Sequence, residues 1–178
     1  MRKVVLGMQV SLDGYVATTD GKLDWAFAHF DDEQGQVAIE ALSQLGVVLL
    51  GRSNYQEQAA AWPNREGPLA DIMNPIPKIV FSTTLDHVEW QNARLATGSP
   101  AEEIAQLKQQ PGKDIGVAGG ARFAQSLSKD GLIDEYILTV HPVALGSGMP
   151  LFVAPINLKL LNARTLASGA LVLTYQRV

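Results

Sequence analysis

The 178-residue sequence contains no cysteine, and its 14 lysine and arginine residues are scattered along the chain. The absence of cysteine excludes disulfides, cysteine-ligated zinc and thiol nucleophiles, and it fits a reducing cytoplasm. The net charge is −4, and no basic cluster is present. Because nucleic-acid binding through the phosphate backbone needs clustered basic side chains, we expect no nucleic-acid partner.

Long apolar runs are also lacking. The first residues include Arg2 and Lys3, as in a signal peptide, but Gln9, Ser11 and Asp13 interrupt the apolar stretch that follows. No apolar segment of the sequence approaches the length needed to span a bilayer. These features predict a cytoplasmic protein with no membrane partner.

Histidine is rare as well, and His29, His87 and His141 lie far apart with no second ligand at metal-binding spacing. We therefore expect no metal site. Ser11 and Ser82 have no evident histidine and aspartate partners, so a hydrolytic triad is not predicted. The composition is otherwise that of an ordinary globular protein, with 47% hydrophobic residues. A single domain covering residues 1–178 is expected.

Apolar segments and turn residues predict an alternation of strands and helices. The expected strands cover residues 3–11, 15–17, 47–51, 78–82, 114–120, 134–146, 157–166 and 171–178. The expected helices cover residues 32–45, ended by Gly46, and residues 52–62, 99–108 and 121–130, the last closed by Gly131. Residues 64–77 contain several prolines and predict a loop. In the third helix, Ser99 is the expected N-cap, with Pro100 at the first position and Glu102 completing a capping box.

The alternation favours an α/β fold with a central, mostly parallel sheet flanked by helices. The last two strands are separated by the short stretch Ala-Ser-Gly, which indicates a hairpin. We expect this hairpin to form an antiparallel edge of the sheet.

Three predicted strands end in glycine or hydroxyl residues. These groups are Gly51, Arg52 and Ser53; Ser82, Thr83 and Thr84; and Gly119, Gly120, Ala121 and Arg122. Ligands of open α/β sheets bind beyond the carboxyl ends of strands, and helix N-termini there attract anions. Together the three groups indicate a site for a phosphorylated cofactor, although each alone is more typical of a turn.

Four aspartates surround the aromatic residues Trp25, Phe27 and Phe30, and two of them are candidates for catalysis. Asp13 or Asp31 could orient a polar heterocycle or transfer a proton. In the alternative interpretation, Asp13 serves a turn and Asp31 or Asp32 caps the next helix.

Several segments in this order resemble the dihydrofolate reductase fold, and more closely the reductase domain of riboflavin biosynthesis and its stand-alone bacterial relatives. The matching segments are SLDGYVA, DGKLDW, LLGRSNYQ, IVFSTTL, VAGGARFAQSL and GLIDEYILTVHPVALGSGMPLF. The resemblance implies an NADPH-dependent reductase that transfers a hydride to a small pteridine-like or pyrimidine-like substrate. It also implies a homodimer. An alternative is a nucleotide-binding protein of this fold without catalytic activity.

The resemblance also implies roles for the three strand ends. Gly51, Arg52 and Ser53 would face the cofactor, and Gly119 and Gly120 would pass close to its pyrophosphate and nicotinamide. Ser82, Thr83 and Thr84 would lie near the 2′-phosphate. The segment DGKLDW resembles the mobile loop of dihydrofolate reductases, with Leu23 and Trp25 matching on the substrate side and Asp24 in place of a proline. The deaminase that accompanies some riboflavin reductases needs a Cys-x-x-Cys signature, which this chain lacks.

Overall fold

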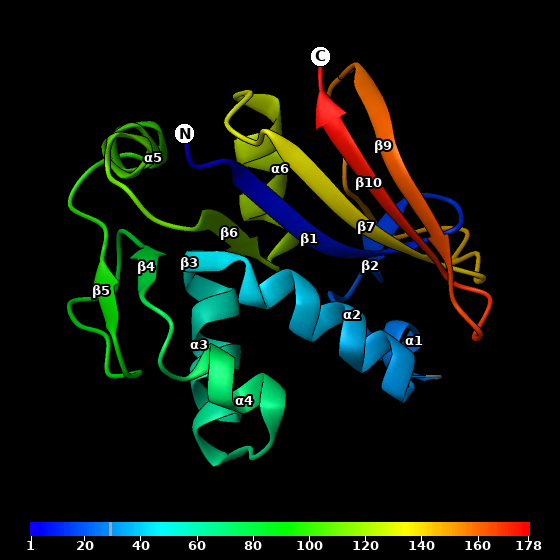
Figure 1. Cartoon of the computed structure of the whole chain (residues 1–178), viewed down its shortest axis with the longest axis horizontal. Helices are drawn as coiled ribbons and strands as arrows, with labels where there is room; N and C mark the ends of the chain where they lie inside the picture. The colour runs from blue at the N-terminus through cyan, green and yellow to red at the C-terminus, as the bar shows by residue number, and fades with distance from the viewer. Residues whose placement is uncertain (29) are drawn as a thin grey trace.

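The centre of the computed structural model, which describes residues 1–28 and 30–178, is an eight-stranded sheet (Figure 1). Its strands, in spatial order, are β5 (Ala93–Leu95), β4 (Lys78–Phe81), β3 (Leu45–Gly51), β6 (Asp114–Ala118), β1 (Val4–Ser11), β7 (Glu135–His141), β10 (Leu171–Arg177) and β9 (Leu158–Thr165). Two short strands, β2 (Tyr15–Ala17) and β8 (Met149–Pro150), pair with each other.

The first six strands in this spatial order, from β5 through β4, β3, β6 and β1 to β7, run parallel to one another. Strand β10 is antiparallel to both β7 and β9. The predicted parallel sheet and its antiparallel C-terminal hairpin are therefore confirmed. Because the parallel strands point the same way, β1, β3, β4 and β6 all end at one edge of the sheet.

Helices cover both faces of the sheet (Figure 1). Helices α2 (Asp32–Ser43), α3 (Arg52–Ala61) and α4 (Pro68–Met73) lie on one face, and α5 (Pro100–Gln109) and α6 (Ala121–Lys129) lie on the other. A single turn, α1 (Asp24–Phe27), precedes α2, and a 3₁₀ turn (Trp62–Asn64) follows α3. No helix among the described residues is long and apolar enough to cross a membrane.

The alternation of side chains along β3 explains this two-sided core. Val47 and Leu49 pack in the cluster that includes α5 and α6, whereas Val48 and Leu50 pack in the cluster that includes α3 and α4. All four are buried. A strand buried on both faces reads as a continuous apolar run, which is the pattern of this segment.

The structure corrects several predicted boundaries. The helix predicted to reach Leu45 ends at Ser43, and Gly46 lies inside β3 instead of closing the helix. The segment 64–77 contains helix α4, whose first turn accommodates Pro68 because the first helical N–H needs no partner. Strand β7 ends at His141, directly before Pro142. Helix α1 and the short strands β5 and β8 were not predicted at all.

Other local predictions are confirmed. Ser99 caps α5, with Pro100 in its first turn and both bonds of the capping box to Glu102 present. Gly131 follows α6 with a φ of +67°, a backbone conformation typical of glycine after a helix. Of the three histidines considered above, His29 lies outside the described residues.

Candidate functional site

A cleft of about 460 Å³ lies at the edge where the parallel strands end. It is lined by residues 51–54 at the start of α3, by residues 119–123 at the start of α6 and by residues of the segment 16–23. We call this the glycine cleft. It brings together two chain segments separated by more than sixty residues, because β3 and β6 are neighbours in the sheet.

A second hollow of about 630 Å³, which we call the hydroxyl cleft, adjoins the first. It is lined by residues 81–84, at and just after the end of β4, and by residues 98–100 at the start of α5. Arg52 and Phe123 line both clefts, which therefore lie side by side, and we call the two together the groove. All ten residues predicted to contact a cofactor line this groove.

The backbone of the glycine cleft requires residues without side chains. Gly119 and Gly120 have φ values of +64° and +76°, which side-chain-bearing residues rarely adopt. A Cβ on Gly119 would lie 2.9 Å from the Asn54 side-chain nitrogen, and one on Gly51 would lie 3.0 Å from Cβ of Phe123. Glycine at these positions therefore lets the starts of α3 and α6 pack closely at the floor of the cleft.

The start of α6 offers hydrogen-bond donors to this cleft. Its N-cap is Gly120, so no side chain caps the first N–H groups of the helix. Uncapped N–H groups and the helix dipole favour an anion at this end. The Asn54 side chain, which donates to the carbonyl oxygen of Ala118, fixes the approach of α3 to this turn.

In the hydroxyl cleft, the Arg52 guanidinium lies beside two hydroxyl residues. Its Nη1 donates to Oγ1 of Thr84 at 2.8 Å. The hydroxyl oxygen of Ser82 accepts hydrogen bonds from the backbone N–H groups of Thr84 (3.1 Å) and Leu85 (3.0 Å), which folds this loop into a tight turn. A cation and several hydroxyls at one place can bind a phosphate group.

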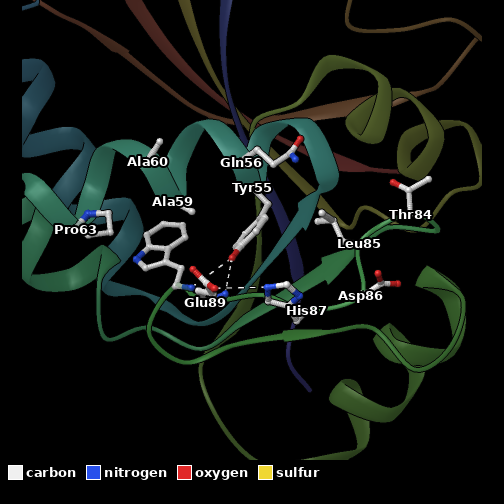
Figure 2. A pocket seen from close by; sticks show the side chains of 11 residues that line it. Tyr55, Gln56, Ala59, Ala60, Pro63, Thr84, Leu85, Asp86, His87 and Glu89 are labelled. Carbon is white, nitrogen blue, oxygen red and sulfur yellow. Dashed lines mark hydrogen bonds and ion pairs between the residues drawn. The ribbon is translucent and has the colours of Figure 1, made fainter.

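A further groove of about 680 Å³ lies between α3 and the connection from β4 to β5 (Figure 2). Thr84 is the one predicted site residue among those that line it. The Tyr55 hydroxyl points to this connection, where it accepts hydrogen bonds from the N–H groups of Glu89 (2.9 Å) and Trp90 (3.3 Å). Tyr55 therefore anchors the chain that follows residues 82–85, which we call the hydroxyl loop.

The two residues predicted on the substrate side are separated by the structure. Leu23 lines the glycine cleft. Trp25 lines a different pocket, beside His141 at the end of β7. Because α1 begins between them, residues only two positions apart project into different spaces.

The structure does not bring either candidate catalytic carboxylate into the groove. Asp13 accepts hydrogen bonds from the Ser11 hydroxyl (2.6 Å) and from the N–H groups of Leu145 (3.1 Å) and Gly146 (2.7 Å). The Ser11 hydroxyl, helped by these N–H groups, lowers the pKa of Asp13 to about 2. Asp31 is the N-cap of α2 and accepts from the N–H of Gln34 at 2.8 Å. Both carboxylates thus have the turn and capping contacts that the alternative interpretation predicted.

Sequence reasoning missed four polar residues of the glycine cleft. They are Thr19, Asp20, Asn54 and Glu57. Asn54 is part of the segment LLGRSNYQ and Asp20 is the first residue of DGKLDW, so these segments contained a signal, whereas the positions of Thr19 and Glu57 follow from tertiary packing alone. Among the described residues, no group of three or more histidine, aspartate or glutamate side chains could hold a metal ion.

Comparison with known proteins gives one family over nearly the whole chain. The model described as the RibD C-terminal domain matches residues 2–172. The uncharacterised protein YyaP of Bacillus subtilis (strain 168) is 35% identical over 182 residues, which cover 98% of this chain and 94% of that protein. A second uncharacterised protein of the same organism, YwjB, is 36% identical over 151 residues, or 85% of this chain and 83% of that protein.

Solved structures show the same architecture. A putative riboflavin biosynthesis protein from Shewanella sp. PV-4 has a TM-score of 0.77 and 25% identity over 99% of each chain. Dihydrofolate reductase from Enterococcus faecalis, solved with NADP(H), has a TM-score of 0.64 and 14% identity over 98% of this chain and 96% of that one. The fold is therefore that of dihydrofolate reductase, as predicted.

Proposed function

Because the chain belongs to the family of the RibD C-terminal domain, we propose that it is an NADPH-dependent reductase acting on a small heterocyclic substrate. The observation that carries this proposal is the pair of adjoining clefts lined by all ten residues expected to contact the cofactor. The relatives support a reductase of this fold, and the choice of cofactor and substrate is our inference.

The groove fits an elongated molecule with phosphates at two places. The uncapped start of α6, beside Gly119 and Gly120, would receive the pyrophosphate. Arg52, Ser82 and Thr84 would hold the 2′-phosphate that distinguishes NADPH from NADH.

NADPH, when bound, supplies the hydride. The residues of the chain bind and orient the reactants and exclude water from between them. Met8, Val16 and Leu23 give the glycine cleft an apolar side that suits a nicotinamide ring. Asp13 is not the proton donor in this proposal, because a carboxyl group with a pKa of about 2 is ionised at neutral pH.

The first test is a fluorescence titration of the protein with NADPH and NADH. We expect NADPH to bind more tightly, because Arg52 and the hydroxyl loop contact the additional phosphate. The Arg52→Ala variant should bind NADPH about 10-fold to 100-fold more weakly, since a hydrogen bond to a charged group contributes about 1.5–3 kcal/mol. Its affinity for NADH should change much less.

Arg65→Ala is a matched control, because Arg65 lies over the Trp62 ring outside both clefts. It should bind NADPH as the wild type does. Equal affinity of the wild type for NADPH and NADH, or an unchanged affinity of Arg52→Ala, would contradict the assignment of Arg52 to the 2′-phosphate.

A nucleotide-binding protein without catalysis is the second candidate. It is favoured by the absence of Asp13 and Asp31 from the groove. The two candidates differ in turnover: a reductase oxidises NADPH in the presence of dihydrofolate or a diaminopyrimidine substrate, which the absorbance of NADPH follows directly. Tight NADPH binding without turnover of either substrate would favour the binding protein.

We also propose that the protein is a homodimer formed through the C-terminal hairpin. Strand β9 is an edge of the sheet, and its Leu160 and Leu161 side chains are 49% and 46% exposed. An exposed edge strand with apolar side chains favours association. We expect Leu161→Glu to shift the mass measured by light scattering from dimer to monomer, whereas Asp71→Lys, at an exposed position of α4 outside the hairpin, should remain dimeric. A monomeric wild type would exclude the proposal.

A further inference from the structure

The proposed 2′-phosphate site is built from two elements that lie far apart in the sequence. Arg52 lies on α3, whereas Ser82 and Thr84 lie in the irregular connection from β4 to β5, residues 82–92. The hydrogen bond between Arg52 and Thr84 joins two exposed residues. Because such a bond competes with bonds to water, it contributes little to holding the connection against α3. Another contact must therefore set the distance between the guanidinium and the hydroxyls.

A buried contact about one turn further along α3 joins the helix to the other end of this connection. Tyr55 follows Arg52 by three positions, so the two side chains lie on the same side of the helix. The Tyr55 hydroxyl accepts hydrogen bonds from the N–H groups of Glu89 (2.9 Å) and Trp90 (3.3 Å) (Figure 2). Tyr55 and Trp90 are buried. Hydrogen bonds that are shielded from water are stronger, so this contact fixes the connection to α3.

Trp90 is in turn held by two buried polar side chains. Its indole Nε1 donates to Oδ1 of Asn74 at 3.0 Å. The ammonium group of Lys78, a fully buried residue, lies 4.1 Å from the centre of the Trp90 ring. This ammonium group donates to three backbone carbonyl oxygens at 2.8, 2.7 and 3.1 Å, which satisfies all three of its N–H groups. We call Tyr55, Asn74, Lys78 and Trp90 the Trp90 anchor.

The Trp90 anchor also contacts the hydroxyl loop itself. Leu85 packs against the apolar cluster that contains Tyr55 and Trp90. The N–H of Leu85 donates to the hydroxyl oxygen of Ser82 at 3.0 Å, and this oxygen also accepts from the N–H of Thr84 at 3.1 Å. The positions of both hydroxyl residues therefore depend on how the connection packs on the anchor.

We propose that Tyr55 is a positioning residue that determines the preference for NADPH over NADH. Its hydroxyl couples the Trp90 anchor to α3, so that the hydroxyl loop and the Arg52 guanidinium face the same space. Tyr55 lines neither the glycine cleft nor the hydroxyl cleft, and it acts through Arg52 and the hydroxyl loop. This inference rests on the proposed function for one point, that the 2′-phosphate binds between Arg52 and the hydroxyl loop.

The Tyr55→Phe variant isolates this role, because it removes only the hydroxyl group. Tyr55, Glu89 and Trp90 line the groove of about 680 Å³, so water can take the place of the hydroxyl and the variant should fold. The connection is then held to α3 mainly by the exposed bond between Arg52 and Thr84. The hydroxyl loop can shift away from the guanidinium, and a site that must be aligned within about 0.5 Å loses affinity for its ligand.

The test measures the affinities of the wild type and of Tyr55→Phe for NADPH and NADH by calorimetry. We expect Tyr55→Phe to bind NADPH about 5-fold to 10-fold more weakly, a smaller loss than that of Arg52→Ala because the guanidinium is still present. Its affinity for NADH, which has no 2′-phosphate, should change by less than about twofold. A merely structural role of Tyr55 would weaken the binding of both nucleotides by the same factor.

Two further variants separate positioning from other effects. In the Arg52→Ala background, Tyr55→Phe should change the affinity for NADPH by less than about twofold, because no guanidinium is left to align. Tyr136→Phe is a matched control. It also removes a buried tyrosine hydroxyl, which lies 2.8 Å from the hydroxyl of Ser128, and Tyr136 lines neither cleft. It should be less stable than the wild type and bind both nucleotides as the wild type does.

An equal NADPH-to-NADH affinity ratio in Tyr55→Phe and the wild type overturns the inference, and so does an undiminished effect of Tyr55→Phe in the Arg52→Ala background. If Tyr55→Phe does not fold, Asn74→Ala, which removes the acceptor of the Trp90 indole, takes its place with the same expected change and the same contradicting result. A wild type that binds neither nucleotide, or both equally, refutes the 2′-phosphate site and this inference together. A selective wild type with an unchanged ratio in the variant refutes the inference alone.

Discussion

The Glu103→Gln variant is expected to lose about 2–4 kcal/mol of unfolding free energy, because its buried carboxylate organises the turn before α5. The Glu103 side chain is 2% exposed and accepts two hydrogen bonds from Arg94, at 2.6 and 3.1 Å. It also accepts from the N–H of Thr97 at 2.8 Å. Arg94 is 49% exposed, so solvent screens part of the attraction, and the expected loss is below that of a fully buried pair.

Urea unfolding at several pH values measures this contribution. Arg94, and to a lesser extent Thr97, lower the pKa of Glu103 to about 2 from an ordinary value of 4.5. The folded state therefore binds this proton less readily than the unfolded state, and the contribution is complete above about pH 4.5. The difference between wild type and variant should shrink as the pH falls from 4.5 towards 2.

Glu89→Gln is a suitable control, because Glu89 is a surface residue whose partner His87 is also exposed. Its melting temperature should equal that of the wild type, whereas Glu103→Gln should melt about 4–16 °C lower. A Glu103→Gln variant as stable as the wild type at pH 7 would show that the carboxylate charge contributes nothing.

The Gly120→Val variant is expected to bind NADPH on the order of a hundredfold more weakly than the wild type. A branched side chain at this position would project from the turn at which α6 begins, inside the glycine cleft. It would displace the ligand from the uncapped N–H groups, and the loss of two hydrogen bonds to a charged group, at about 1.5 kcal/mol each, gives this factor.

Backbone strain complicates this variant, because Gly120 has a positive φ and valine disfavours it. Gly67→Val controls for the strain. Gly67 is also the N-cap of a helix with a positive φ, it lies outside both clefts, and a Cβ there would meet no atom within 4 Å. Both variants should lose about 1–3 kcal/mol of stability, and only Gly120→Val should lose NADPH affinity.

Calorimetry or fluorescence titration of the two folded variants with NADPH measures whether only Gly120→Val loses affinity. Equal NADPH affinity in Gly120→Val and the wild type would mean that the double glycine is a turn and no more. If both variants bind NADPH weakly, the loss of affinity comes from general destabilisation of the protein and not from the side chain in the glycine cleft.

Much of the fold could be predicted because its signals are local. The apolar run of β3, the capping box at Ser99 and the short turn between β9 and β10 depend on residues within one element or on either side of one turn. The ten residues predicted to contact a cofactor lie together for the same reason, since glycine and hydroxyl residues at the ends of parallel strands converge whatever the remaining packing is.

The sequence by itself thus determined the parallel sheet, its antiparallel hairpin and the composition of the groove. Only the tertiary structure decided that Asp13 is held by Leu145 and Gly146, that Glu103 pairs with Arg94, and that Trp25 faces a pocket of its own. Helix α4 and the strand position of Gly46 were likewise decided by packing on the sheet. The physical reason is that periodicity and turn chemistry act over a few residues. The partner of a buried carboxylate or indole, in contrast, is set by which distant segments the sheet places side by side.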